Sequence, residues 1–402
     1  MIAESLGHEG VFVSKLMLTN FRCYSRAVIK PRCEHSLTIL TGPNGAGKTN
    51  VLEAISYLAP GRGLRRAPLL DIARKKGAEN TVSGQDKNWA VAATLKLGSE
   101  PVKVGTGMET PGDEEASNKR LVRIDGQIAA NSNILGERWS IGWLTPQMDR
   151  LFVEGPASRR RFLDRMVLGL FPDHSRQVGA YERVMRERNR LLADKGSSAD
   201  PAWLSALETR MAEHGVAVAM ARLEFAGQLA GQLAEAEEGP FPRAELAIDG
   251  WVESLLAGGT AAVEVEDAFK ERLVAGRSRG QDSSSNGRAH VGVHKTDLVV
   301  THAPKAMQAD LCSTGEQKAL LVALVLANAR LQTALRGQAP LMLMDEVAAH
   351  LDVDRRKALF DALASLGSQC WLTGTDKSLF KDLSMSAEFF DVSDGTIQSA
   401  DM

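Results

Sequence analysis

The sequence predicts an α/β fold whose core is assembled from both ends of the chain, with a helical segment inserted between them. The apolar run Leu37–Thr41 is typical of a buried strand and leads into the glycine-rich stretch Gly42–Thr49. A second apolar run, Leu341–Met344, ends in the carboxylates Asp345 and Glu346. Because strands and helices alternate around these two runs, we expect both to belong to one parallel sheet.

The stretch Gly42–Thr49 has the G-x-x-x-x-G-K-T spacing of a phosphate-binding loop between a strand and a helix. Its glycines let backbone N–H groups approach phosphate oxygens, and a helix expected from Asn50 to about Leu58 adds its positive end. A glycine-rich turn without a ligand is the alternative, which the order of strand, lysine, hydroxyl and helix disfavours. The predicted nucleotide-binding residues here are Gly42, Pro43, Asn44, Gly45, Ala46, Gly47, Lys48, Thr49 and Asn50.

The strand that ends in Asp345 and Glu346 supplies the second half of a site for nucleotide hydrolysis. We expect Lys48 to reach the β- and γ-phosphates, and Thr49 and Asp345 to hold Mg²⁺. Glu346 would polarise the attacking water as general base. The predicted catalytic residues are therefore Lys48, Asp345 and Glu346, and the predicted cofactors are ATP and Mg²⁺.

A second phosphate site is predicted in the stretch Leu311–Lys318, before an apolar helix expected from Ala319 to about Leu335. Ser313 and Gly315 at a helix N-terminus form an anion site that a nucleotide held on Lys48 does not need, which suggests a second nucleotide. An ordinary Ser/Thr helix cap is the alternative. The position just before the Asp-Glu strand favours the anion site.

These motifs together resemble those of the ABC-type ATPases, whose active sites form between two head domains. The signature loop L-S-G-G-Q of that family is matched at Leu311, Ser313, Gly315 and Gln317, with departures at Thr314 and Glu316. The resemblance implies that Gln147 is the residue that links Mg²⁺ to a helical lobe. It also implies signature contacts to the nucleotide from Ser313, Thr314, Gly315 and Gln317.

The segment after the Asp-Glu strand extends this resemblance. Ala348–Asp352 resembles the D-loop, and the strand Gln369–Thr373 leads to the place where transporters carry a switch histidine. That histidine is absent. Thr373 and Thr375 are the candidates to sense the γ-phosphate instead, so a hydrolysis rate does not follow from transporters.

Length and composition limit the class of protein. With 402 residues, 44% hydrophobic and 24% charged, the chain can form two or three folded domains. No apolar stretch approaches the roughly 18 uninterrupted residues of a membrane span, and residues 1–13 lack signal-peptide character. We therefore expect a cytoplasmic protein without a membrane partner. Buried reduced thiols are expected at the four cysteines, which lack metal-binding spacing: Cys23, Cys33, Cys312 and Cys370.

The middle of the chain predicts a compact lobe of short helices rather than a coiled coil. Neither heptad repeats nor a C-x-x-C hook occur there. The predicted division is a head part over 1–155, an inserted helical lobe over 156–290 and a second head part over 291–402. Breaks between helices are expected near Pro172, Pro201 and Pro240. In the head, antiparallel hairpins are expected at 89–97, 102–104 and 121–124. A mobile loop is expected at 276–286.

Several stretches in combination resemble the RecF family of bacterial replication and recombination-repair proteins. Leu18–Tyr24 is similar to the family's L-x-N-F-R-N-Y, and Gly292–Asp297 stands where the family has G-P-H-R-D-D, with Val293 and Lys295 as departures. Further similarity lies in 143–149 with 155–164, and in 181–192, and the resemblance runs from about Lys15 to Gly395.

The resemblance implies a slow ATPase that acts in DNA repair. ATP bound to one subunit would be capped by Ser313 and Gly315 of a second, closing a homodimer on double-stranded DNA near single-strand gaps, and hydrolysis through Glu346 would reopen it. The implied partners are gapped DNA, RecR and RecO, with help in loading RecA. Two other classes remain open: the ATP-binding subunit of a transporter, which needs a coupling surface for a membrane partner, and an SMC-type clamp, which needs a long coiled coil.

The charge pattern gives little independent support for DNA binding. The net charge is −2, and a local run of basic residues is more often a solvated face than a nucleic-acid surface. The expected DNA role therefore depends mainly on the resemblance. The basic clusters are Arg62, Arg65 and Arg66; Arg74, Lys75 and Lys76; Arg159, Arg160 and Arg161; and Arg183, Arg186, Arg188 and Arg190.

Overall fold

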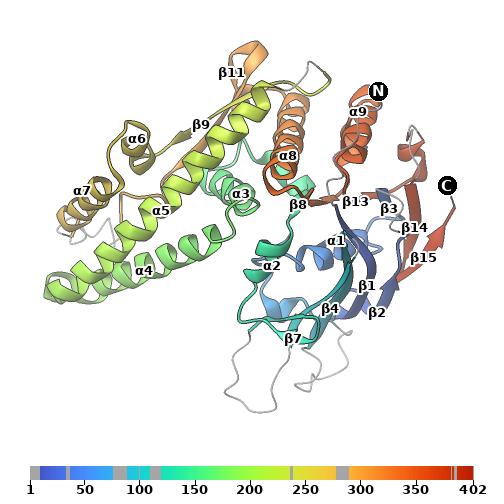
Figure 1. Ribbon diagram of the computed structural model, residues 1–402, viewed down its shortest axis with the longest axis horizontal. Helices are drawn as coiled ribbons and strands as arrows, with labels where there is room; N and C mark the ends of the chain where they lie inside the picture. The colour runs from blue at the N-terminus through green and yellow to red at the C-terminus, as the bar shows by residue number, and fades with distance from the viewer. Residues whose placement is uncertain are drawn as a thin grey trace. The chain divides into compact units, whose positions relative to one another are not determined.

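The computed structural model describes residues 10–32, 37–75, 88–98, 100–108, 119–235, 239–277, 289–381, 383 and 387–401. The chain forms two compact units (Figure 1). The first unit comprises 1–149, 238–241 and 321–402, and the second comprises 150–237 and 242–320. Both ends of the chain therefore build the first unit, as the sequence predicts.

The sheet that carries the phosphate loop has six strands in the order β15-β14-β3-β13-β12-β8. All neighbouring strands are parallel except β14 and β15. Every residue of β3, β12 and β13 is buried, which explains why their sequences are continuous apolar runs without alternation. The strands are β3 Leu37–Thr41, β8 Ile141–Leu144, β12 Leu341–Met344, β13 Cys370–Gly374, β14 Ala387–Ser393 and β15 Thr396–Ala400.

A second sheet of the first unit is antiparallel, with six strands in the order β2-β1-β4-β5-β6-β7. The hairpins expected from the sequence are confirmed, because β4 pairs with β5 and β5 with β6. One face is apolar and the other more polar, as the alternating burial along β4 shows. The strands are β1 Val11–Phe21, β2 Tyr24–Ile29, β4 Trp89–Leu97, β5 Glu100–Met108, β6 Leu121–Ile124 and β7 Gln127–Ile128.

Helix α1 (Lys48–Ser56) packs in the core shared by these two sheets (Figure 1). Val51, Leu52 and Ile55 are fully buried in the same hydrophobic cluster as Leu343 and Trp371. The helix begins at the phosphate-loop lysine, two residues before the predicted start. The remaining helices with residues in this unit are α2 Ile134–Arg138, α8 Thr314–Arg336 and α9 Val353–Ala364.

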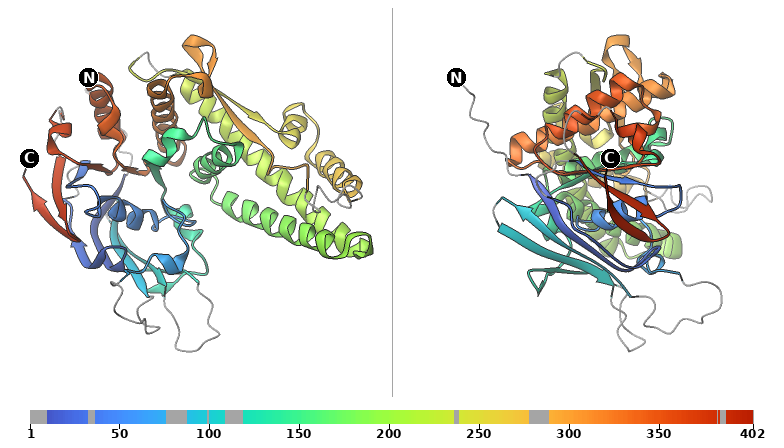
Figure 2. Two further views of the ribbon diagram at one scale, coloured as in Figure 1. Left: turned by 180° about the vertical axis from the view of Figure 1, so that it is seen from behind. Right: turned by 90° about the vertical axis from the view of Figure 1, so that its right-hand side faces the viewer.

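The second unit is mainly helical, and its helices α4 and α5 pack against each other (Figure 1 and the left view of Figure 2). The prediction of short helices is wrong for α5, which has 34 residues. Asp200 caps its start by accepting a hydrogen bond from Ala202 N, Pro201 follows at the first turn, and Gly215 allows Phe269 to pack closely. Its helices are α3 Pro156–Leu168, α4 His174–Lys195, α5 Pro201–Ala234, α6 Trp251–Ala257 and α7 Ala262–Ala275.

The second unit also holds a three-stranded antiparallel sheet in the order β11-β10-β9. Because β10 (Asp297–His302) pairs with β9 (Ala244–Asp249), residues 291–320 belong to this unit and not to the predicted C-terminal head part. The third strand is β11 (Met307–Gln308). The predicted mobile loop at 276–286 lies mostly outside the described residues.

Helix α8 begins in the second unit and continues in the first. Within the described part of the chain, it is the helix that is long and apolar enough to cross a membrane by composition alone. Most of its apolar stretch is buried inside the protein, as in the core helix of a folded domain. Short 3₁₀ helices occur at Leu69–Asp71, Pro146–Arg150, Gly196–Ser198, Ala303–Lys305, Ala309–Leu311, Val347–His350 and Lys377–Phe380.

Candidate nucleotide site

The phosphate loop follows β3 and is shaped by glycines that other residues cannot replace. Gly42, Gly45 and Gly47 all have positive φ angles, of 145°, 82° and 115°. A Cβ atom on Gly42 would lie 2.1 Å from the carbonyl oxygen of Val392. Behind the loop, the Tyr24 hydroxyl donates a hydrogen bond of 3.0 Å to Gly47 O and fixes its last turn.

Lys48 lies inside this loop with its side chain almost fully buried. Its Nζ donates to the carbonyl oxygens of Gly42 at 2.7 Å and Pro43 at 2.9 Å. Burial lowers the pKa of Lys48, and the charges of Glu346 and Asp345 oppose that shift. The ammonium has three protons and two carbonyl partners, so its charge and remaining proton fit a phosphate oxygen. The residues present therefore fit a bound nucleotide.

Two of the three predicted metal-site residues, Thr49 and Asp345, are in direct contact. Thr49 Oγ1 donates to both carboxylate oxygens of Asp345, at 2.9 and 3.1 Å. Burial raises the pKa of Asp345, and hydrogen bonds from Thr373 and Thr49 oppose the rise. A hydroxyl and a carboxylate that converge in this way present oxygen ligands of the kind that Mg²⁺ prefers.

Glu346 follows Asp345 in a backbone conformation that is unusual for its residue type. Its φ is 51°, in the left-handed region, and it stands at the start of the 3₁₀ helix Val347–His350. Its backbone N–H donates to Thr373 Oγ1 at 2.8 Å. Thr373 therefore contacts both acidic residues of the site.

Gln147 emerges from the same edge of the parallel sheet. Strands β8 and β12 pair in register with Leu144 opposite Met344, and Asp345 N donates to Leu144 O at 2.9 Å. Gln147 lies exposed in the 3₁₀ helix that follows β8. In the described residues its side chain makes no hydrogen bond to Thr49 or Asp345, so its predicted metal role stays a prediction.

A buried ion-pair network surrounds Glu53 of α1, and the sequence motifs did not indicate it. Glu53 is fully buried on α1, and its carboxylate accepts from Arg22 at 2.5 and 2.8 Å and from Arg65 at 3.2 Å. Arg65 also donates to Asn50 Oδ1 at 2.8 Å, and Asn50 Nδ2 donates to Cys23 Sγ. A glutamate among the apolar residues of a core helix was the available signal, because a buried carboxylate needs a cationic partner.

The predicted signature residues lie in the second unit, at the start of α8. Ser313 and Glu316 form a capping box: Glu316 Oε2 accepts from Ser313 N at 2.9 Å and from Ser313 Oγ at 2.8 Å. Lys305 pairs with Glu316 and, together with Ser313, lowers the pKa of its carboxyl to about 2. Thr314 and Gly315 are exposed.

Gln317 is instead buried and supports the signature loop from beneath. Its Nε2 donates to Cys312 O at 2.9 Å. Glu316, which departs from the family's signature motif, has a structural role of its own. Its carboxylate accepts the hydrogen bonds from Ser313 and so holds the start of α8.

Several basic residues of the predicted clusters are structural. Arg159 makes a bidentate ion pair of 2.7 Å with Asp297, and Arg160 donates to Thr296 O. Arg188 is buried and pairs with Glu208 at 2.9 Å. The charges of Arg159 and Arg188 are compensated inside the second unit, and Arg160 is tied to the backbone there, so these three are poor candidates for a DNA surface.

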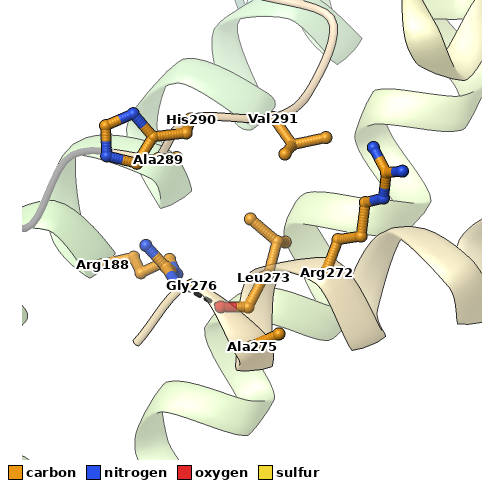
Figure 3. Close-up of a pocket in the computed structure, with 8 residues that line it drawn as sticks. All are labelled: Arg188, Arg272, Leu273, Ala275, Gly276, Ala289, His290 and Val291. Atoms are coloured by element: carbon orange, nitrogen blue, oxygen red, sulfur yellow. Dashed lines mark hydrogen bonds between the residues drawn. The ribbon is translucent and has the colours of Figure 1, made fainter. Parts of the chain in front are cut away.

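A pocket of about 410 Å³ lies in the second unit, lined by residues of α4, α7 and the 289–291 stretch (Figure 3). Arg188 at its edge donates to Leu273 O at 2.8 Å. Arg272 stacks over the ring of Trp251. The pocket contains no residue of the phosphate loop and adds no group to the site.

Metal binding through cysteine and histidine finds no support in the described residues, where no cluster of three candidate ligands occurs. Cys23, Cys312 and Cys370 are free thiols, as expected. Cys23 is half-buried, and Cys33 lies outside the described residues.

The chain is similar to known proteins over almost its whole length. The family described as "RecF/RecN/SMC N terminal domain" matches residues 12–398. The chain is 46% identical over 386 residues to the DNA replication and repair protein RecF of Mesorhizobium japonicum, covering 96% of this chain and 97% of the relative. It is 46% identical over 391 residues to the RecF of Brucella suis, covering 97% and 96%.

Solved structures share the fold. A structure of the recombination mediator protein RecF-ATP in the RecFOR pathway superposes with a TM-score of 0.79 at 18% identity, covering 98% of both chains. The Smc head domain of Pyrococcus furiosus, with an extended coiled coil and bound to part of ScpA, gives a TM-score of 0.51 at 16% identity, covering 98% of this chain and 96% of that one.

Proposed function

The chain belongs to the RecF/RecN/SMC family, and within it to the RecF proteins, and from that premise we propose that it is an ATP-dependent DNA replication and repair protein. The observation that supports this most strongly is the meeting of Thr49 with Asp345 beside the buried Lys48. Two segments 296 residues apart in sequence thereby meet, which supports a single phosphate and metal site.

The site residues divide the work of hydrolysis among them. ATP with Mg²⁺ supplies the phosphoryl group and the cation that neutralises its developing charge. Lys48 binds the β- and γ-phosphates, and Thr49 and Asp345 hold the metal. Glu346 accepts the proton of the attacking water. Gln147, exposed at the same sheet edge, is assigned to the metal site from the side of β8.

ATP is proposed to act also as the ligand that joins two subunits. The signature residues Thr314 and Gly315 would contact the nucleotide held by the partner. Ser313, which the sequence motif predicts to share that contact, donates both its N–H and its Oγ–H to Glu316, so Ser313 and the buried Gln317 would hold the loop in place. The exposure of Thr314 and Gly315 at the start of a long helix supports this role, because the N–H groups of a first helical turn have no partner within the helix and attract phosphate. Binding energy is then linked to assembly, and hydrolysis through Glu346 reopens the dimer.

A basic row on α4 is proposed as a surface for duplex DNA. Arg183, Arg186 and Arg190 follow the helical spacing of one face, and all three are exposed. Arg186 pairs with Glu182 at 3.5 Å, a weak surface ion pair. Among the described residues no ion pair or hydrogen bond occupies the side chains of Arg183 and Arg190. Their charges are available to phosphates.

The proposed partners follow from the same family. We infer duplex DNA next to single-strand gaps as the substrate, RecO and RecR as protein partners, and RecA as the protein whose loading is assisted. The proposed compartment is the cytoplasm, where chromosomal gaps are repaired.

Fluorescence anisotropy of a labelled gapped duplex, titrated with ATP and Mg²⁺ at several salt concentrations, tests the function and the surface together. We predict that Arg183→Ala/Arg190→Ala lowers DNA affinity and reduces the slope of log K against log salt by about two, one for each lost phosphate contact. Arg210→Ala/Lys270→Ala removes the same charge elsewhere in the second unit and is the matched control.

The outcomes separate two failures. A double variant with the affinity and salt slope of the wild type contradicts the α4 surface alone. If the wild-type protein shows no DNA binding with or without ATP, and its anisotropy titration is the same as that of Lys48→Ala, the proposed function is contradicted.

A further inference from the structure

Thr373 connects the two acidic residues of the site through a single hydroxyl. It is the fourth residue of β13 and is 1% exposed. Its Oγ1 donates to Asp345 Oδ1 at 2.9 Å and accepts from the backbone N–H of Glu346 at 2.8 Å. The one proton of the hydroxyl is therefore committed to Asp345, which leaves none for a phosphate oxygen.

The turn that Thr373 contacts needs such support. Strand β12 ends at Met344, which pairs with Leu372 of β13, so Asp345 and Glu346 extend beyond the last paired position. Glu346 then adopts φ 51°, which residues other than glycine rarely occupy unless their surroundings hold them there. The hydrogen bond from Glu346 N to Thr373 is a contact that holds this conformation.

The same hydroxyl also restrains the carboxylate that faces Thr49. Asp345 Oδ1 accepts from both Thr373 and Thr49, each at 2.9 Å, so the carboxylate is fixed from the β13 side and from the α1 side. A change in one acid would thus be transmitted to the other through Thr373.

We propose that Thr373 is a positioning residue for hydrolysis, which fixes the carboxylate of Asp345 and the backbone of Glu346 relative to each other and does not itself contact the nucleotide. The inference rests on the proposed ATPase function. It replaces the expectation that Thr373 senses the γ-phosphate. ATP binding through Lys48 and the phosphate loop does not need this hydroxyl, whereas alignment of the general base does.

Thr94 provides the matched control. It lies in β4, in the antiparallel sheet of the first unit, has the same side chain and is half-buried. Its substitution by valine makes the same chemical change at a residue with no assigned part in the nucleotide site, and a β-branched valine suits a strand.

Steady-state ATP hydrolysis and nucleotide binding by the full chain test the proposal, with Thr373→Val, Thr373→Ser and Thr94→Val. We expect Thr373→Val to lower kcat by about 10- to 100-fold, because a buried N–H and a carboxylate lose their partner. Its Kd for ATP should stay within about threefold, since the phosphate contacts are intact. Thr373→Ser should recover most of kcat, and Thr94→Val should match the wild type.

Three results would overturn the proposal. The first is a kcat of Thr373→Val equal to that of the wild type. The second is a Kd of Thr373→Val for ATP that rises by as large a factor as its kcat falls. The third is a kcat of Thr373→Ser as low as that of Thr373→Val. Thermal melting shows whether Thr373→Val is folded; if it is not, Thr373→Ala replaces it in the same comparison with Thr373→Ser. Absence of hydrolysis in the wild type itself would count against the ATPase function instead, so the two failures are distinguishable.

Discussion

At the scale of single residues, burial acts on the two charges of the nucleotide site in opposite directions. It lowers the pKa of Lys48 and raises the pKa of Asp345, because a low-dielectric environment disfavours any charged form. Each charge is supported by hydrogen bonds: carbonyl oxygens at Lys48, and hydroxyl groups at Asp345. The site is therefore organised around groups that gain from a bound polyphosphate and a divalent cation.

Glu346→Gln tests the role of the general base. The amide keeps the size of the side chain but cannot accept the proton of water, so we predict a fall in kcat of about 10²- to 10⁴-fold with ATP binding retained. Single-turnover hydrolysis and equilibrium nucleotide binding measure the two effects separately. Normal hydrolysis in this variant would contradict the assignment of Glu346.

Spacing in the sequence could indicate the residues proposed to act directly on a nucleotide, but not the residues that hold them in place. Lys48, Thr49 and Asp345 belong to local motifs, and the structure brings the last two within hydrogen-bonding distance. The role of Thr373 depends on the register of β13 against β12, which no local pattern encodes. The ion pair of Arg22 with Glu53 likewise joins the turn between β1 and β2 to α1, a contact that no local pattern encodes.

At the scale of elements, continuous apolar runs identified the strands around the site correctly, because parallel strands covered on both faces need no alternation. The helices of the second unit were expected to be short, whereas α5 has 34 residues. The breaks expected near Pro172, Pro201 and Pro240 are confirmed, because Pro172 and Pro240 lie outside the helices and Pro201 stands at the first turn of α5. Inside α5, Gly215 packs against the ring of Phe269. Tertiary packing thus outweighed local propensity.

The stretch Gly292–Asp297 links α4 to β10 through a neutral histidine. Tyr181 on α4 lies 2.7 Å from His294 Nδ1, and His294 Nε2 lies 3.0 Å from Ala289 O, which suits a donor at Nε2 and an acceptor at Nδ1. Burial lowers the pKa of His294 to about 4, and the positive charges of Lys295, Arg160 and Arg222 add to the effect.

This arrangement predicts a pH-dependent stability. The unfolded chain, with a histidine pKa of 6.5, binds a proton between about pH 4 and 6.5 that the folded protein does not. Stability should therefore fall as pH drops through that window, with a contribution approaching about 1.4 kcal/mol per pH unit. Thermal melting at pH 7 and pH 5 of the wild type and His294→Gln measures it. An equal loss in both proteins would contradict a role for His294.

At the scale of the whole molecule, two compact units divide the proposed roles. The first unit carries the phosphate loop and both acidic residues, and the second carries the signature loop and the basic row on α4. The longest described helix of the second unit, α5, packs against α4 and α7, so this part of the chain shows no free coiled-coil arm of the kind that an SMC-type clamp requires. The predicted helical lobe ended at 290 and left out β10. The sequence could not indicate that β10 belongs there, because its pairing with β9 joins segments that are distant in the chain.

Sedimentation velocity of Glu346→Gln with ATP and Mg²⁺, with and without a gapped duplex, tests the central claim most directly. Because this variant should bind ATP without hydrolysing it, we predict a dimer that forms only with ATP and that the duplex favours. Lys48→Ala should stay monomeric because it cannot bind the phosphates, and Ser313→Arg should stay monomeric while still binding ATP. A Glu346→Gln protein that binds ATP yet remains monomeric with and without DNA would contradict the account.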